Sequence, residues 1–192
     1  MLLVRTTLHP VLVLICVNLG MYKTFNERAV DVEVLIRGNV LRQCAVTELA
    51  LLRMIIFCNE EKPDIEKDIF DFKSLMFFAK IGKAQKLLKE QYPDIEDKNQ
   101  ELFNELYELK DFRNLIAHSM FEFDQSLPNP TAFILWEVIK PPDKIQFFDS
   151  VGYTIDDVDK MVKRIKKANK VLLGINIIIE DNFNRRFPGF LG

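Results

Sequence analysis

The chain has 192 residues, of which 48% are hydrophobic and 28% are charged. This hydrophobic fraction excludes an intrinsically disordered protein, and the length suits one domain that buries its own core. The 26 Lys and Arg residues against 28 Asp and Glu residues give a net charge of -2, which excludes a protein that coats nucleic acid through bulk positive charge. The three cysteines, Cys16, Cys44 and Cys58, are far apart and form no CxxC motif, which favours a reducing cytoplasm and no structural zinc.

The first twenty residues contain an apolar segment, Leu8 to Leu19, which is preceded by Arg5. A membrane-spanning helix needs roughly 20 apolar residues, so this segment is too short to cross a bilayer. Three interpretations stay open: an upstream start codon included in error, a genuine apolar strand or helix, and a signal sequence without the usual cleavage site. Because an ordinary domain start follows Met21, we expect residues 1–20 to be dispensable for folding and residues 21–192 to form a single domain.

A long first helix is predicted from its start signal and its period. Thr24-Phe25-Asn26-Glu27 has the form of a capping box, and the helical spacing then continues to a polar stretch before Pro63. Gly38 lies inside this pattern, where it would permit a kink or a break. The apolar positions that define the period are Val30, Val34, Leu41, Ala45, Leu49, Leu52 and Ile56.

A second helix is predicted from about Phe72 to Gln91, with Pro93 as its stop. Four lysines fall at every third position along it, and we interpret them as a solvated face. They are Lys80, Lys83, Lys86 and Lys89.

The third predicted helix, from about Ile95 to Phe123, contains a charge in an unusual position. With ~100° of rotation per residue, one arc of this helix is apolar, and Arg113 falls in the middle of it. A guanidinium group cannot be neutralised and is rarely buried without a partner, so Arg113 requires an anionic group. The apolar positions of the arc are Leu102, Leu106, Leu109, Ile116, Ala117 and Met120.

The last third of the chain predicts a small β-hairpin and a final helix. Residues 131–139 are rich in β-branched and aromatic residues, a turn follows at Pro141-Pro142-Asp143-Lys144, and an extended pattern resumes from Ile145 to Phe148. A second capping box, Thr154-Ile155-Asp156-Asp157, opens a helix from about Ile155 to Phe183. The sequence therefore predicts an all-α fold, a bundle of about four helices with a small β-hairpin inserted before the last one.

One constellation in the chain could carry chemistry, the segment from Arg113 to Ser119. Arg holds phosphate oxygens in a fork, and His can move a proton to or from a ribose or leaving oxygen near neutral pH. Residues five apart on a straight helix are separated by about 140° and ~7.5 Å, so two copies about a dyad would present Arg113 and His118 better than one. The structural alternative is that Arg113 pairs with a carboxylate at a helix contact while His118 caps the helix. No metal or cofactor motif is present, and we expect neither group.

The segment Glu108-Leu109-Lys110-Asp111-Phe112-Arg113-Asn114-Leu115-Ile116-Ala117-His118-Ser119 resembles the signature of the HEPN superfamily. That signature is an Arg, usually followed by a polar residue such as Asn, with a His five positions after the Arg. The resemblance extends loosely from Met21 to Phe183 and is specific only from Arg113 to Ser119. It implies a small all-α bundle, commonly dimeric, and in many members metal-independent endoribonuclease activity in toxin–antitoxin, abortive-infection or CRISPR defence.

This resemblance implies that Arg113 and His118 are the catalytic pair and that Asn114 is the supporting polar residue, placed to orient the imidazole. The leading expectation is thus a cytoplasmic, homodimeric endoribonuclease with RNA as substrate, acting as a defence, toxin or stress effector. An antitoxin or other regulatory protein is a further expected partner, whereas DNA and a membrane are not expected. Met120 stands where HEPN toxins regulated by a nucleotidyltransferase often carry Tyr, which argues against that type of control.

Two other functions stay open. Some members of the superfamily keep the motif for folding, dimerisation or binding, so the alternative is a non-catalytic helical dimer that binds a protein or a nucleotide. The third interpretation, an envelope-associated protein, depends on the apolar N-terminus alone.

Overall fold

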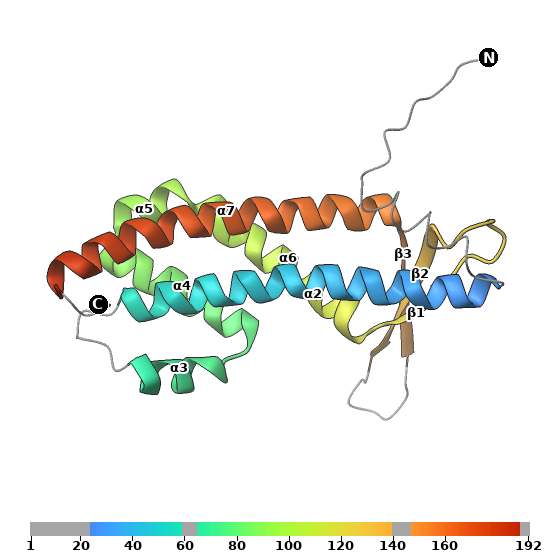
Figure 1. The fold of residues 1–192 in the computed structure, drawn as a ribbon, viewed down its shortest axis with the longest axis horizontal. Coiled ribbons are helices and arrows are strands. Elements are labelled where there is room, and N and C mark those ends of the chain that lie inside the picture. The colour runs from blue at the N-terminus through green and yellow to red at the C-terminus, as the bar shows by residue number, and fades with distance from the viewer. Residues whose placement is uncertain (1–23, 59–64, 140–146, 189–192) are drawn as a thin grey trace, which may run out of the picture. The chain divides into compact units, whose positions relative to one another are not determined.

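The computed structural model describes residues 24–58, 65–139 and 147–188 (Figure 1). Within these ranges the protein has six α-helices and one antiparallel sheet of three strands. The chain divides into two compact units: unit 1 contains the chain up to Gly38 and Ser119–Ile155, and unit 2 contains Asn39–His118 and the chain from Asp156 onward. Residues 1–20 lie outside the described ranges, and both their dispensability and the single domain over 21–192 stay predictions.

The first helix, α2 (Phe25–Phe57), begins at the predicted capping box. The backbone N–H of Glu27 donates to Thr24 Oγ1 at 3.3 Å, and the backbone N–H of Thr24 donates to Glu27 Oε2 at 3.1 Å. These reciprocal bonds satisfy donors that the helix itself leaves unpaired. The helix continues through Gly38 without a break.

The core-facing side of α2 differs from the predicted one. Of the seven positions expected to face the core, only Ile56 is buried, and Val30, Val34 and Leu49 are each more than half exposed. Apolar residues occur on more than one face of this helix, so the helical period fits several arcs and only packing selects among them. The apolar side chains that α2 buries are Val32, Ile36, Val40, Cys44, Leu51, Met54, Ile55, Ile56 and Phe57.

The middle of the chain is more finely divided than predicted. The run expected from Phe72 to Gln91 separates into α3 (Ile65–Lys73) and α4 (Phe77–Gln91). Pro93 begins α5 (Pro93–Lys98) instead of stopping a helix, because a proline in the first helical turn lacks only an N–H that would have no partner there. The helix α6 (Gln100–His118) follows and ends before Phe123.

The lysines of α4 do not form one solvated face. Lys80 is buried, whereas Lys86 and Lys89 are exposed. A spacing of three residues turns by about 300°, so Lys80 and Lys89, nine residues apart, point in roughly opposite directions. The interpretation of these lysines as one solvated face is therefore wrong for Lys80, which is buried.

Unit 1 contains the sheet, in the order β1-β2-β3. The predicted hairpin is confirmed in part as the antiparallel pair β2 (Ala132–Ile139) and β3 (Phe147–Thr154), in which Ala132 pairs with Thr154. Its second strand continues beyond the expected end at Phe148 as far as Thr154. The sheet is larger than a hairpin because β1 (Met120–Phe123), expected to be helical, pairs with β2. The fold is thus mostly helical, and the turn expected at residues 141–144 lies outside the described residues.

Aromatic side chains and one arginine secure the start of β1. The ring of Phe133 stacks on that of Phe121 with centroids 4.8 Å apart, a cross-strand contact of the kind that stabilises sheets. The guanidinium of Arg37 lies 4.6 Å from the centroid of the Phe121 ring, and its Nη2 donates to the carbonyl oxygen of Ser119 at 2.6 Å. These contacts favour a strand directly after α6.

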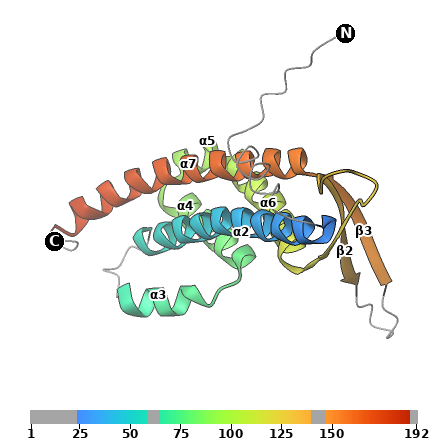
Figure 2. The same cartoon turned by 45° about the vertical axis from the view of Figure 1, so that its right-hand side comes forward.

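Unit 2 is helical, and within it α7 (Ile155–Arg186) packs against α2. Figures 1 and 2 both show α7 beside the part of α2 that belongs to this unit. Asn176 Nδ2 donates to the carbonyl oxygen of Ala50 at 2.9 Å, and the rings of Phe57 and Phe183 meet edge to face at 5.1 Å. None of the described helices has the length and apolar run needed to cross a membrane.

Candidate functional site

The helix α6 presents Arg113 from an otherwise buried face. The predicted arc is confirmed at Leu102, Leu106, Leu109 and Ile116, which are buried, but not at Met120, which is 56% exposed and belongs to β1. The side chain of Arg113 is 30% exposed, and its Nε atom is buried without a hydrogen-bond partner among the described residues. The guanidinium therefore begins inside the apolar arc and reaches the surface only in part.

Two groups of the same chain contact the guanidinium of Arg113. Its Nη1 donates to Asn114 Oδ1 at 3.0 Å, which is an ordinary hydrogen bond. Its Nη2 lies 4.0 Å from Glu48 Oε1, which is too long for a hydrogen bond and marks a loose ion pair. The structural alternative, a carboxylate at a helix contact, is thus present in a weak form, and the guanidinium keeps N–H groups that these contacts do not use.

Glu48 forms its closer contact with a different cation. Its Oε2 accepts a hydrogen bond from Lys80 Nζ at 2.8 Å, and the side chain of Lys80 is only 8% exposed. One carboxylate therefore lies between two cations, so the group of Arg113, Glu48 and Lys80 carries a net charge of +1. We call these three residues the charge cluster.

Sequence reasoning missed both Glu48 and Lys80 as members of a site. Lys80 was assigned to the solvated face, and Glu48 lies on α2, far from Arg113 along the chain. No local pattern connects these residues, because they meet only when α2, α4 and α6 pack together. The unexplained charge of Arg113 in an apolar arc was the one signal that such a partner had to exist.

The structure does not bring all three predicted site residues together. Asn114 uses its side-chain oxygen for Arg113, so it supports the arginine and not the imidazole of His118. His118 is the last residue of α6, its side chain is exposed, and no described residue hydrogen-bonds to it. A single chain thus presents His118 apart from the charge cluster, as the straight-helix separation of five residues requires.

Cys44 lies beside the charge cluster but is a poor nucleophile. Burial raises the pKa of the Cys44 thiol to about 11. The positive charge of Arg113 acts to lower this pKa, and the negative charge of Glu48 acts to raise it. Burial likewise raises the pKa of Cys58 to about 12. Because the thiolate is the reactive form, neither cysteine supports nucleophilic chemistry near neutral pH. Among the described residues, no group of three or more His, Cys, Asp or Glu side chains could hold a metal ion.

The raised pKa of Cys44 predicts a loss of stability in alkaline solution. An unfolded thiol ionises near its ordinary pKa of 9.0, whereas the buried thiol stays protonated until about 11. The unfolded state therefore gains stability as the pH rises from 9.0 toward 11, and the free energy of unfolding should fall by up to ~1.4 kcal/mol for each pH unit in that window. Urea unfolding at several pH values measures this fall, and a Cys44→Ala variant should show a smaller one. Equal slopes in the two proteins would contradict the prediction.

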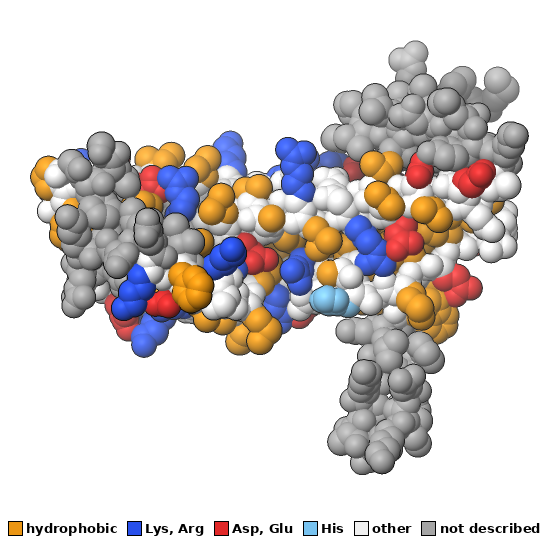
Figure 3. Space-filling view, turned by 60° about the horizontal axis from the view of Figure 1, so that its bottom comes forward, with side chains coloured by type: hydrophobic (Ala, Val, Ile, Leu, Met, Phe, Trp, Pro, Cys, Tyr) orange, Lys and Arg blue, Asp and Glu red, His pale blue; other side chains and the backbone are white. Residues whose placement is uncertain are grey.

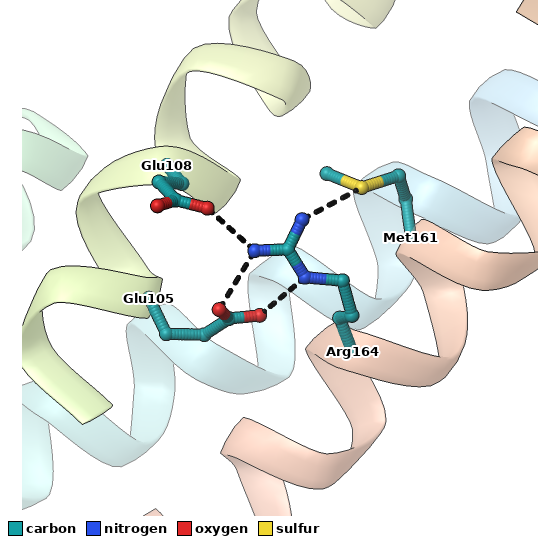
Figure 4. A network of polar contacts seen from close by, with 4 residues as sticks. All are labelled: Glu105, Glu108, Met161 and Arg164. Atoms are coloured by element: carbon teal, nitrogen blue, oxygen red, sulfur yellow. Dashed lines mark hydrogen bonds and ion pairs between the residues drawn. The ribbon is translucent and has the colours of Figure 1, made fainter. Parts of the chain in front are cut away.

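An arginine network holds α6 against α7 near the motif (Figure 4). Arg164 donates from Nε and Nη2 to the two carboxylate oxygens of Glu105, each at 2.7 Å, and from Nη2 to Glu108. These hydrogen bonds raise the pKa of Arg164 above its usual value. Such two-pronged pairs fix geometry as well as charge, so they orient the helix that carries Arg113 and His118.

One hollow in the surface of unit 2 lies between α6 and α7. A cavity of about 360 Å³ in unit 2 is lined by Lys98, Glu105, Arg164 and Lys167 among others, and by none of Arg113, Asn114 and His118. On the face shown in Figure 3, basic, acidic and apolar side chains are intermixed and no continuous basic tract appears.

Searches for similar proteins found no protein-family model, curated protein or solved structure that matches this chain. The HEPN resemblance accordingly depends on the Arg113–Ser119 segment and the order of the elements.

Proposed function

We propose that this protein is a HEPN-like, metal-independent endoribonuclease that works as a homodimer. The observation that carries the proposal is the state of the two motif residues. His118 projects from the end of α6 without a hydrogen bond to any described residue, and Arg113 retains unused N–H groups five residues before it. An exposed imidazole suits proton transfer at a phosphodiester, and an incompletely paired guanidinium, brought to it from a partner protomer, suits binding of the phosphate.

The chemistry requires no metal ion. His118 takes the proton of a ribose 2′-OH, the 2′ oxygen attacks the adjacent phosphorus, and the bond to the 5′ oxygen of the next nucleotide breaks. The leaving 5′ oxygen takes a proton from the protonated imidazole or from water, so the products are a 2′,3′-cyclic phosphate and a new 5′-OH. Arg113 stabilises the negative charge that develops on the phosphoryl oxygens. A dimer of α6 helices about a dyad would place His118 of one protomer near Arg113 of its partner.

The biological setting that we propose follows from the same resemblance. An endoribonuclease of this type acts as a toxin, defence or stress effector in the cytoplasm, and an antitoxin or other regulatory protein would hold it inactive.

The test is purified protein incubated with total RNA in EDTA, with a His118→Ala variant beside the wild type. We expect the wild type to cut RNA in EDTA and light scattering at tens of micromolar to report a dimer. A folded, dimeric wild-type protein that leaves RNA intact with and without divalent metal would refute the enzyme proposal.

A second candidate function is a non-catalytic helical dimer that binds a partner protein or a nucleotide. The observation in its favour is that Asn114 and Glu48 already contact Arg113 within one chain, as they would if the arginine had a structural or binding role and no catalytic one. This candidate predicts binding of RNA or protein that depends on Arg113, without any cleavage that depends on His118.

A further inference from the structure

The distances within the charge cluster are the reverse of those that the hydrogen-bonding capacities of its two cations would favour. Glu48 is the carboxylate that forms an ion pair with Arg113 in the part of the chain that the structure describes, yet its oxygen remains 4.0 Å from the guanidinium Nη2. The same carboxylate is 2.8 Å from Lys80 Nζ, although an Arg–carboxylate pair can form two parallel hydrogen bonds and a Lys pair cannot.

We propose that Lys80 is a positioning residue that holds Glu48 away from Arg113 and so keeps the arginine available to a phosphate group of RNA. The inference deepens the proposed function and rests on Arg113 contacting the RNA backbone. It assigns Lys80 no contact with substrate, since its side chain is 8% exposed and its amine is bonded to Glu48.

The physical reason is competition between two anions for one guanidinium. If Lys80 loses its charge, Arg113 is the one cation among the described residues that still pairs with Glu48. A partly buried carboxylate is costly without a counterion, so Glu48 should move toward Arg113. Glu48 would then close the 4.0 Å separation and occupy the N–H groups that a phosphate needs. An incoming phosphate would have to displace this internal carboxylate, so RNA would bind more weakly.

The experiment measures the binding of a 2′-O-methyl RNA oligonucleotide, which has no free 2′-OH and cannot be cut, by fluorescence anisotropy. The proteins are the wild type, Arg113→Gln, Lys80→Met, Lys80→Arg, Glu48→Gln and the double variant Lys80→Met with Glu48→Gln. Circular dichroism confirms that each is folded. The matched control is Lys86→Met, which removes the same charge from the same helix at a side chain that is 74% exposed.

We expect Lys80→Met to weaken binding by about tenfold, the scale of one charge-assisted contact. Lys86→Met should change it less than about twofold, as expected for an exposed charge. Removing the competing carboxylate in the double variant should restore wild-type affinity, and Lys80→Arg should retain it. In cleavage assays, Lys80→Met should lower kcat/KM, because an Arg113 occupied by Glu48 binds the phosphate less well and stabilises the developing charge less, and the double variant should restore it.

Any one of three results would overturn the inference. They are wild-type RNA affinity in Lys80→Met, an affinity of the double variant that stays as low as that of Lys80→Met, and RNA binding that does not depend on Arg113. If Lys80→Met does not fold, the single variant Glu48→Gln provides the test. It should bind RNA at least as tightly as the wild type does. Weaker binding would contradict the inference. Binding that follows the expected pattern without any RNA cleavage would refute the endoribonuclease proposal and leave the role of Lys80 standing.

Discussion

Replacing His118 by alanine is expected to lower the rate of RNA cleavage by about 10²–10⁴-fold, the usual contribution of one general acid–base group. His118 is the only histidine among the described residues, so no second described imidazole can substitute for it. Because its side chain is exposed and forms no described hydrogen bond, the substitution removes no packing, and the melting temperature should change little.

The measurement is cleavage of a labelled RNA in EDTA, with thermal unfolding recorded on the same preparations. A His118→Gln variant tests proton transfer more strictly, because glutamine keeps polarity but cannot act as an acid or a base. Asp111→Asn is the matched surface control, since Asp111 is an exposed residue of the same helix and should leave the rate unchanged. Cleavage by His118→Ala at the wild-type rate would remove His118 from the mechanism.

Arg113→Ala should also suppress cleavage, but it is a less clean test. The substitution removes one of the two cations around Glu48, so it changes the charge cluster as well as any contact with RNA. A loss of activity in that variant therefore has two physical causes, whereas a loss in His118→Ala has one.

Replacing Phe183 by alanine is expected to lower the free energy of unfolding by about 3–5 kcal/mol, as large-to-small substitutions of buried aromatic residues do. Phe183 is 0% exposed on α7 and packs edge to face against Phe57 of α2. The lost free energy includes the cost of the cavity left behind and the lost contact between the two rings.

Urea unfolding followed by circular dichroism measures this loss. Phe70→Ala is the matched control, because Phe70 is 80% exposed on α3 and its truncation should change stability by less than about 0.5 kcal/mol. Equal stability losses in the two variants would show that the contact between α2 and α7 contributes little to unit 2.

Features that depend on neighbouring residues were predictable from the sequence. The capping box at Thr24 and Glu27 forms because both partners lie within one helical turn. The buried arc of α6, the pairing of β2 with β3 and the span of α7 likewise follow from local period, local turn signals and short separations along the chain. The position of Arg113 within an apolar arc was visible for the same reason.

Features that depend on distant residues were decided only by the tertiary structure. β1 is four residues long and directly follows a helix, so its own pattern is too short to predict a strand, and pairing with β2 stabilises it. The buried face of α2 was misassigned because its apolar residues fit several arcs and packing alone distinguishes them.

The candidate site divides in the same way. The sequence by itself determined that Arg113, Asn114 and His118 share one helix and that Arg113 needs an anion, because both conclusions use only helical geometry and the permanent charge of a guanidinium. The tertiary structure alone decided that this anion is Glu48 and that Lys80 binds it more closely. The physical reason is that an ion pair across packed helices depends on which faces meet, and no spacing within one helix encodes that.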